Sequence, residues 1–154
     1  MDVNTLNKRT NIEQHKELSR KYAAFERLIV ELNKREIPSA IVVIINKDID
    51  HINSFSGTNR DLLRQLGKAE SEILKLIERE LKLVTKNHYR KEWLALGMAA
   101  FGLPLGAAWG MLIGNMAFLA IGLPIGMAIG VAFGSVKDKK AYRNGKQLDV
   151  DMDA

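Results

Sequence analysis

Cysteine is absent from this chain of 154 residues, which excludes disulfides, zinc-finger spacings and thiol nucleophiles. The chain also lacks a phosphate-binding glycine loop, a nucleophile elbow and the paired histidines of zinc proteases. Its histidines, His15, His51 and His88, are far apart in the sequence. His51 lies beside Asp48 and Asp50, but a metal site would need further ligands. We therefore expect no catalytic residues, no metal and no cofactor.

Charge is absent from residues 93–136, where 44 consecutive positions lack Asp, Glu, Lys, Arg and His. Residues 1–92, by contrast, carry 18 basic and 14 acidic residues. A helix of that length would reach about 66 Å, roughly twice the ~30 Å hydrocarbon thickness of a bilayer. We therefore predict a transmembrane hairpin with spans at about 93–114 and 116–136, turning near Asn115. The alternative is a helical hairpin buried in a soluble core, but so short a chain has little material to cover it.

Glycine is concentrated in this uncharged stretch, which holds nine of the twelve glycines. Eight of them form two ladders with four-residue steps: Gly102, Gly106, Gly110 and Gly114, then Gly122, Gly126, Gly130 and Gly134. Residues 99–114 align with residues 119–134 with eight identities in sixteen positions, which indicates an internal duplication. In lipid, small residues let helices approach closely, so these glycines are predicted to be helix-packing positions.

The two ladders can pack within one hairpin or between copies of the chain. With the turn at Asn115, they are expected to overlap only near the middle of an antiparallel hairpin. Part of each groove would then need a second copy, so we predict a homo-oligomer. Pro104 and Pro124 each remove a helical hydrogen bond and are predicted hinges. They are either tolerated kinks or paired interruptions that mark a solute path.

Basic and aromatic residues flank the uncharged stretch on both sides, whereas the turn has no basic residue. By the positive-inside rule both termini then face the cytoplasm, and we predict a multi-pass protein of the bacterial inner membrane. The N-terminus is charged and polar, so we expect it not to be a secretory signal. Anionic lipid headgroups, rather than nucleic acid, are the expected partners of the flanking cations. The predicted membrane-interface residues are Lys86, Tyr89, Arg90, Lys91, Trp93, Lys137, Lys139, Lys140, Tyr142 and Arg143.

Residues 11–92 have the apolar periodicity of helices, after a flexible N-terminus at 1–10. The first helix is expected from an Asn11 cap to Ile37, before Pro38. The second covers residues 39–55, although its β-branched centre also permits a strand.

The third predicted helix starts at a Thr58 cap, and no Pro or Gly separates Val84 from Trp93. It is therefore expected to run without a stop into the first span. The predicted fold is all-α: a cytoplasmic antiparallel three-helix bundle or coiled coil whose third helix continues into a transmembrane glycine-zipper hairpin. Residues 137–154 are expected to be a basic stub and an acidic tail.

The two ladders, followed by Asp138-Lys139-Lys140-Ala141, resemble the bacterial glycine-zipper membrane proteins. The resemblance is limited to residues 93–141. It implies membrane insertion and oligomeric packing. The group includes pore-formers, translocated effectors and structural proteins, and the lipoprotein signal of many envelope members is missing here.

Three functions remain open on the sequence. The first is a homo-oligomeric pore or channel gated by its cytoplasmic helical domain. The second is a non-conducting membrane anchor or scaffold, whose cytoplasmic bundle recruits a protein partner. The third is a translocated effector that inserts into a target membrane.

Overall fold

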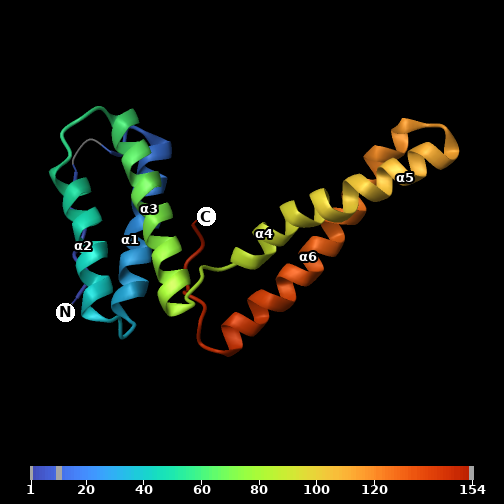
Figure 1. Ribbon diagram of the computed structural model, residues 1–154. Helices are drawn as coiled ribbons and strands as arrows, with labels where there is room; N and C mark the ends of the chain where they lie inside the picture. The colour runs from blue at the N-terminus through green and yellow to red at the C-terminus, as the bar shows by residue number, and fades with distance from the viewer. Residues whose placement is uncertain (1, 10–11, 153–154) are drawn as a thin grey trace. The chain divides into compact units, whose positions relative to one another are not determined.

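The computed structural model describes residues 2–9 and 12–152, except for the side chain of Met116 (Figure 1). The chain forms two compact units. The N-terminal unit comprises residues 1–86 together with residues 148–154, and the hairpin unit comprises residues 87–147. Each unit is described by itself. The regular secondary structure of the described residues is helical, as the sequence predicts, and no extended sheet forms among them.

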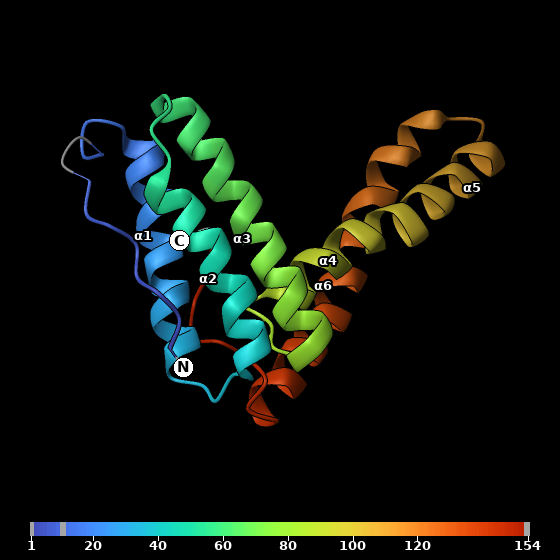
Figure 2. The ribbon, with the colours of Figure 1, turned by 60° about the vertical axis from the view of Figure 1, so that its left-hand side comes forward.

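Three helices make up most of the N-terminal unit: α1 (Lys16–Asn33), α2 (Ser39–Ser54) and α3 (Asn59–Leu81). They lie side by side in both ribbon views (Figures 1 and 2) and share one apolar core. Its largest fully buried side chains are Phe25, Leu28, Leu32, Val42, Ile45, Ile49, Ile52, Leu62, Leu66, Ile73, Ile77 and Leu148. Residues 39–54 are helical rather than a strand, because their apolar residues keep a helical step through the polar positions.

The start of α3 agrees with the predicted capping chemistry, whereas α1 begins only at Lys16, after His15, which makes no side-chain cap bond. The Thr58 hydroxyl accepts a hydrogen bond from the Asp61 N–H at 3.2 Å and so caps α3. Pro38 directly precedes α2, and α1 ends at Asn33, short of the predicted Ile37. The predicted Asn11 cap lies outside the described residues.

The prediction that the third helix runs into the first span is wrong. α3 ends at Leu81, because Lys82 adopts a left-handed backbone conformation with φ 57°. Asn87 also has a positive φ, 58°, and α4 begins after it. Neither residue is glycine, so the sequence gives little warning of the two turns.

The hairpin unit has two helical arms. The first contains α4 (His88–Gly97), the π-helical η1 (Met98–Gly102) and α5 (Leu103–Ile113). The second contains the 3₁₀ turn η2 (Met116–Phe118) and α6 (Leu119–Arg143). Between them Gly114 has φ 71°, a conformation that glycine adopts without strain, so the turn lies where the sequence predicts.

The predicted basic stub forms the end of α6, whereas the described part of the predicted loose tail packs into the N-terminal unit. α6 continues to Arg143, and Leu148 and Val150 are buried in the core of the N-terminal unit. There the Leu148 N–H donates to the Val84 carbonyl at 2.8 Å, and the Lys86 N–H donates to the Val150 carbonyl at 3.0 Å. These bonds hold the returning chain against the segment that follows α3.

The described part of the N-terminus, residues 2–9, packs against the N-terminal unit, whereas the sequence predicts a flexible segment. Val3 and Leu6 are buried in the core of the N-terminal unit. Side chains of α1 and α2 bind the backbone of this segment. Val3 and Leu6 alone are too few to establish a period, so the pattern gave no signal.

Candidate membrane-spanning hairpin

Glycine lines the contact between the two arms of the hairpin. A Cβ atom built on Gly106 would lie 2.8 Å from the Leu119 Cα, and one on Gly126 would lie 2.5 Å from the Gly102 nitrogen. These neighbours are backbone atoms, which cannot move aside as a flexible side chain can. The same crowding affects Gly97, Gly102, Gly106, Gly122, Gly126, Gly130 and Gly134. At all of these positions except Gly102 the built Cβ comes within 3.0 Å of backbone, so the arms approach too closely for a larger residue without a shift; at Gly102 the contact is tight, at 3.1 Å.

The second ladder is occupied by the first arm along its whole length. Gly122 packs on the backbone of Gly102 and Gly106. Nearer the open end, a Cβ on Gly130 would clash with the Trp93 carbonyl, and one on Gly134 with the Arg90 backbone. The expectation that part of this groove stays unmatched is wrong, because residues other than glycine also present close backbone. Homo-oligomerisation stays a prediction, but this geometric reason for it no longer holds.

One of the predicted ladder glycines differs from the rest. Gly110 and Gly106 are buried in α5, as Gly102 is in η1. Gly114 instead ends α5 in a left-handed conformation, and a Cβ there would meet nothing within 4 Å. It is a turn residue rather than a packing position.

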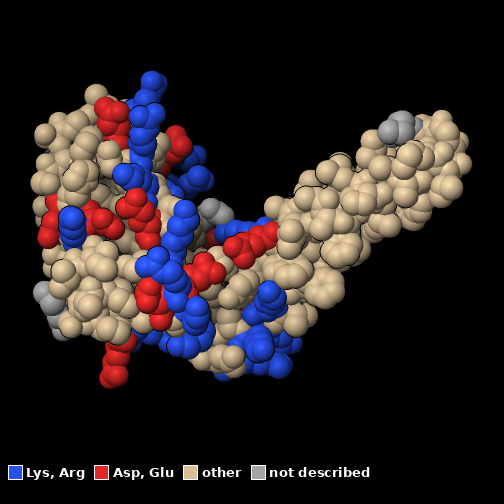
Figure 3. Space-filling model, viewed as in Figure 1, with Lys and Arg blue, Asp and Glu red and all other residues tan. Residues whose placement is uncertain are grey.

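The outer surface of the hairpin carries its large apolar side chains. Leu112 is 83% exposed and Met111 72%. The other exposed large apolar residues of this unit are Leu96, Phe101, Leu103, Trp109, Ile113, Ile121, Met127, Phe133, Val136 and Tyr142. On the face shown in Figure 3 the hairpin surface carries no Asp, Glu, Lys or Arg over most of its length. The two arms, His88–Ile113 and Leu119–Arg143, are long and apolar enough to cross a membrane.

Asp138 links the two arms at the end of the hairpin that lies away from the turn, which we call its base. Its two carboxylate oxygens accept hydrogen bonds from the Tyr89 and Arg90 backbone N–H groups, each at 3.0 Å. Asp138 is buried, and it caps the first turn of α4, for which Asn87 supplies no side-chain cap. A carboxylate at a helix N-terminus also interacts favourably with the helix dipole. The sequence interpretation missed this role, although an acidic residue directly after the predicted second span was the available signal.

Aromatic and basic side chains gather near the same end. The Lys137 ammonium lies 4.6 Å from the Trp93 ring centroid and 5.5 Å from that of Tyr89. The Trp93 and Phe133 rings are 5.7 Å apart. Cations over aromatic faces are attracted by the ring quadrupole. The structure thus brings together Tyr89, Trp93 and Lys137 of the predicted interface set.

The remaining predicted interface residues are distributed differently. Lys91, Lys139, Lys140, Tyr142 and Arg143 are exposed on the hairpin unit.

Lys86 belongs to the N-terminal unit, where it forms an ion pair with Asp149. The hydrogen bond between them raises the pKa of Lys86 and lowers the pKa of Asp149. Lys86 is therefore part of the contact that holds the returning C-terminal segment.

The two prolines lie in different helical surroundings. Before Pro104 the helix widens into η1, where the Leu103 N–H bonds the Met98 carbonyl five residues back. Pro124 lies inside the regular helix α6, without such a widening. Single π-helical turns often mark functional positions in helices, but the role of either proline as a hinge stays a prediction.

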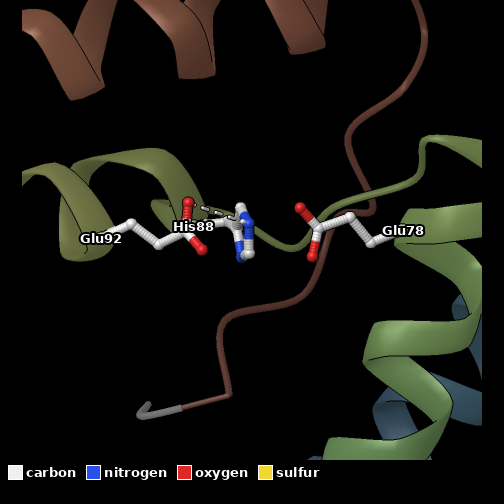
Figure 4. A group of neighbouring side chains, drawn as sticks. All are labelled: Glu78, His88 and Glu92. Carbon is white, nitrogen blue, oxygen red and sulfur yellow. Dashed lines mark ion pairs between the residues drawn. The ribbon is translucent and has the colours of Figure 1, made fainter.

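Among the described residues, one histidine of the hairpin unit lies beside an acidic side chain. His88 and Glu92 are one turn apart on α4, with the His88 Nε2 3.6 Å from a Glu92 carboxylate oxygen (Figure 4). Glu78, also drawn in Figure 4, belongs to the N-terminal unit and is not counted as part of a site with His88 and Glu92. In the N-terminal unit, burial and then the nearby Glu72 carboxylate raise the pKa of Asp48.

No protein-family model, no curated protein and no solved structure matches the chain. The resemblance to glycine-zipper proteins therefore stays a resemblance. Functional inference depends on the geometry of the two units alone.

Proposed function

We propose that the hairpin unit anchors the chain in a membrane and that the N-terminal unit is a helical scaffold held at its surface. The observation that carries this proposal is the inverted packing of the hairpin. Its glycines lie inside against backbone, while side chains such as Leu112 and Met111 point outward. In lipid an outward apolar side chain costs nothing, and close backbone approach replaces the hydrophobic effect as the attraction between helices.

A buried core hairpin is the competing interpretation, and the burial of the hairpin argues against it. Only 22% of the most apolar window of either arm is buried. A core helix of a soluble protein would have most of this surface covered. Exposed apolar patches of such extent mark contact with a membrane or a partner.

The proposed orientation follows from the charges at the base of the hairpin. Arg90 and Lys91 begin the first arm, and Lys137, Lys139 and Lys140 end the second. The turn between the arms carries no basic residue. The positive-inside rule then puts both ends in the cytoplasm of a bacterial cell, against anionic headgroups.

An anchor fits the geometry better than a pore. The glycine grooves are filled within one hairpin, so a pore of several copies would be lined by the apolar outer faces. Such a constriction gates by dewetting and selects no ion. The described residues provide no specific support for the pore or for a translocated effector.

The test is membrane partition together with exchange of the hairpin. We expect the full chain to stay with membranes after an alkaline carbonate wash and to float with liposomes without raising ion flux. A chimera with an unrelated two-span hairpin should remain membrane-bound and keep a folded N-terminal unit. Recovery of the full chain as a soluble monomer without detergent would contradict the anchor. Conductance in liposomes, lost on Gly126→Leu, would favour the pore.

A further inference from the structure

Residues 2–9 are held along α1 and α2 by side-chain amides, in the way a protein binds an extended peptide. In Figure 1 this segment is the blue trace beside these two helices. Three asparagines make the contacts: Asn33 at the end of α1, and Asn46 and Asn53 on α2. Each amide accepts from one backbone N–H of the segment and donates to one backbone carbonyl.

The two α2 contacts repeat with a fixed offset. Asn46 accepts from the Asn4 N–H at 2.7 Å and donates to the Asp2 carbonyl at 3.2 Å. Asn53 accepts from the Asn7 N–H at 2.9 Å and donates to the Thr5 carbonyl at 3.0 Å. Each of these two amides thus binds the backbone on both sides of one residue of the segment.

The bracketed residues are Val3 and Leu6, the two buried apolar residues of the segment. Asn46 and Asn53 are seven residues apart on a helix, which is about 10.5 Å. Three residues of extended chain cover about 10 Å. The spacing of the amides therefore matches a peptide that places an apolar side chain in the groove at every third position.

Arg9, three positions after Leu6, makes a further contact at the end of the segment. The Arg9 guanidinium donates to the carbonyls of Ile52 and Phe55, each at 2.7 Å, at the C-terminus of α2. A cation is favourable at the C-terminus of a helix, where the last carbonyls lack the usual helical partner. The Ile52 carbonyl also accepts from the Phe55 N–H at 3.2 Å. The bound pattern is thus apolar-x-x-apolar-x-x-Arg.

We propose that the α1–α2 groove is a recognition site for an extended peptide with this pattern, and that residues 2–9 are its built-in competitor. Backbone hydrogen bonds supply affinity for any extended chain, whereas the positions of Val3, Leu6 and Arg9 supply specificity. Because the segment is covalently attached, its effective concentration is high, and a partner peptide must displace it. The inference depends only on the N-terminal unit, so it stands or falls separately from the membrane anchor.

The experiment uses the full chain with residues 2–9 deleted and, as probe, a fluorescent synthetic peptide of residues 2–9. We expect saturable binding, measured by anisotropy, at least tenfold tighter than to the undeleted chain. A probe with Leu6→Asp should bind at least tenfold more weakly. In the deleted chain Asn53→Ala should weaken binding about tenfold, while the matched control Asn59→Ala on α3 should leave it unchanged.

A second measurement covers the case in which the deleted chain does not fold. A protease site is inserted at the exposed Glu13–Gln14 turn of the full chain and cut, after which the labelled peptide is added in excess. Exchange of the cut segment for the probe supports the site. A dimer that dissociates when free peptide is added also supports it, because the second copy then donates its own residues 2–9 to the groove. Binding of a scrambled peptide with equal affinity, or a cut segment that never exchanges, would overturn the proposal.

Discussion

The N-terminal unit buries Phe25, Leu66 and Ile77 completely, whereas the hairpin exposes Leu112 and fills its interior with glycine. The same kinds of residue thus occupy opposite positions in the two units. In water, large apolar side chains stabilise the fold by leaving the solvent. In lipid that gain disappears, and close contact between backbones takes its place. The comparison predicts that removing side-chain volume destabilises the N-terminal unit, whereas adding side-chain volume destabilises the hairpin unit.

The largest expected effect is the loss of volume from the N-terminal core. Ile45 is completely buried, so Ile45→Ala should lower the free energy of unfolding by about 2–5 kcal/mol through lost burial and a residual cavity. The neighbouring Ile44 is 48% exposed and gives a matched control. Ile44→Ala should change stability by less than about 0.5 kcal/mol in urea unfolding followed by circular dichroism. Equal losses for the two variants would contradict the described core.

The reverse experiment adds volume to the hairpin. Gly126→Ala places a methyl group 2.5 Å from the Gly102 nitrogen, so the arms must separate. We expect a loss of about 1–3 kcal/mol from overpacking. Unfolding of the hairpin in mixed detergent micelles, with fluorophores on the two arms, measures this change. Unaltered stability would mean that the arms are not in such close contact.

The base of the hairpin offers a smaller and more local test. Asp138→Ala removes the cap of α4 and should cost about 1 kcal/mol in the same micelle assay. Asp138→Asn keeps one oxygen acceptor and should cost less. Lys139→Ala, at an exposed neighbour, is the control. If all three variants behave alike, the carboxylate does not hold the two arms together.

The smallest expected effect is a gain in stability rather than a loss. A Cβ on Gly67 of α3 would meet nothing within 4 Å, in contrast to Gly126. Gly67→Ala should therefore stabilise the N-terminal unit by about 0.5–1 kcal/mol, because alanine has the higher helix propensity. A rise in the urea midpoint without a change in slope would agree, and a fall would show an undetected close neighbour.

The repeat units show how far a local sequence determines structure. Gly102-Leu103-Pro104 and Gly122-Leu123-Pro124 are identical, yet only the first follows a π-helical turn. Pro104 lies deep within the first arm, where the preceding turns of helix oppose its ring. Pro124 is the sixth residue of α6, so little regular helix precedes it. The periodicity predicts both arms and the turn but not this difference.

Other features could not be predicted because they depend on contacts between distant residues. The break after α3 requires left-handed Lys82 and Asn87, and neither residue is typical of a strong helix stop. Leu148 and Val150 are too few to give a periodic signal, although both are buried. The glycine ladders were identifiable as packing positions, but their register, and with it the partner of each glycine, depends on how the two arms meet.

The return of Leu148 and Val150 to the N-terminal unit affects the order in which the chain matures on the ribosome. Both residues belong to a core whose other members are almost all translated before the hairpin. The nascent N-terminal unit must therefore wait, with a gap where Leu148 belongs, until both arms have been synthesised. For the proposed anchor, insertion of the arms into a bilayer would then begin before this unit is complete, because its last core residues follow the hairpin in the sequence.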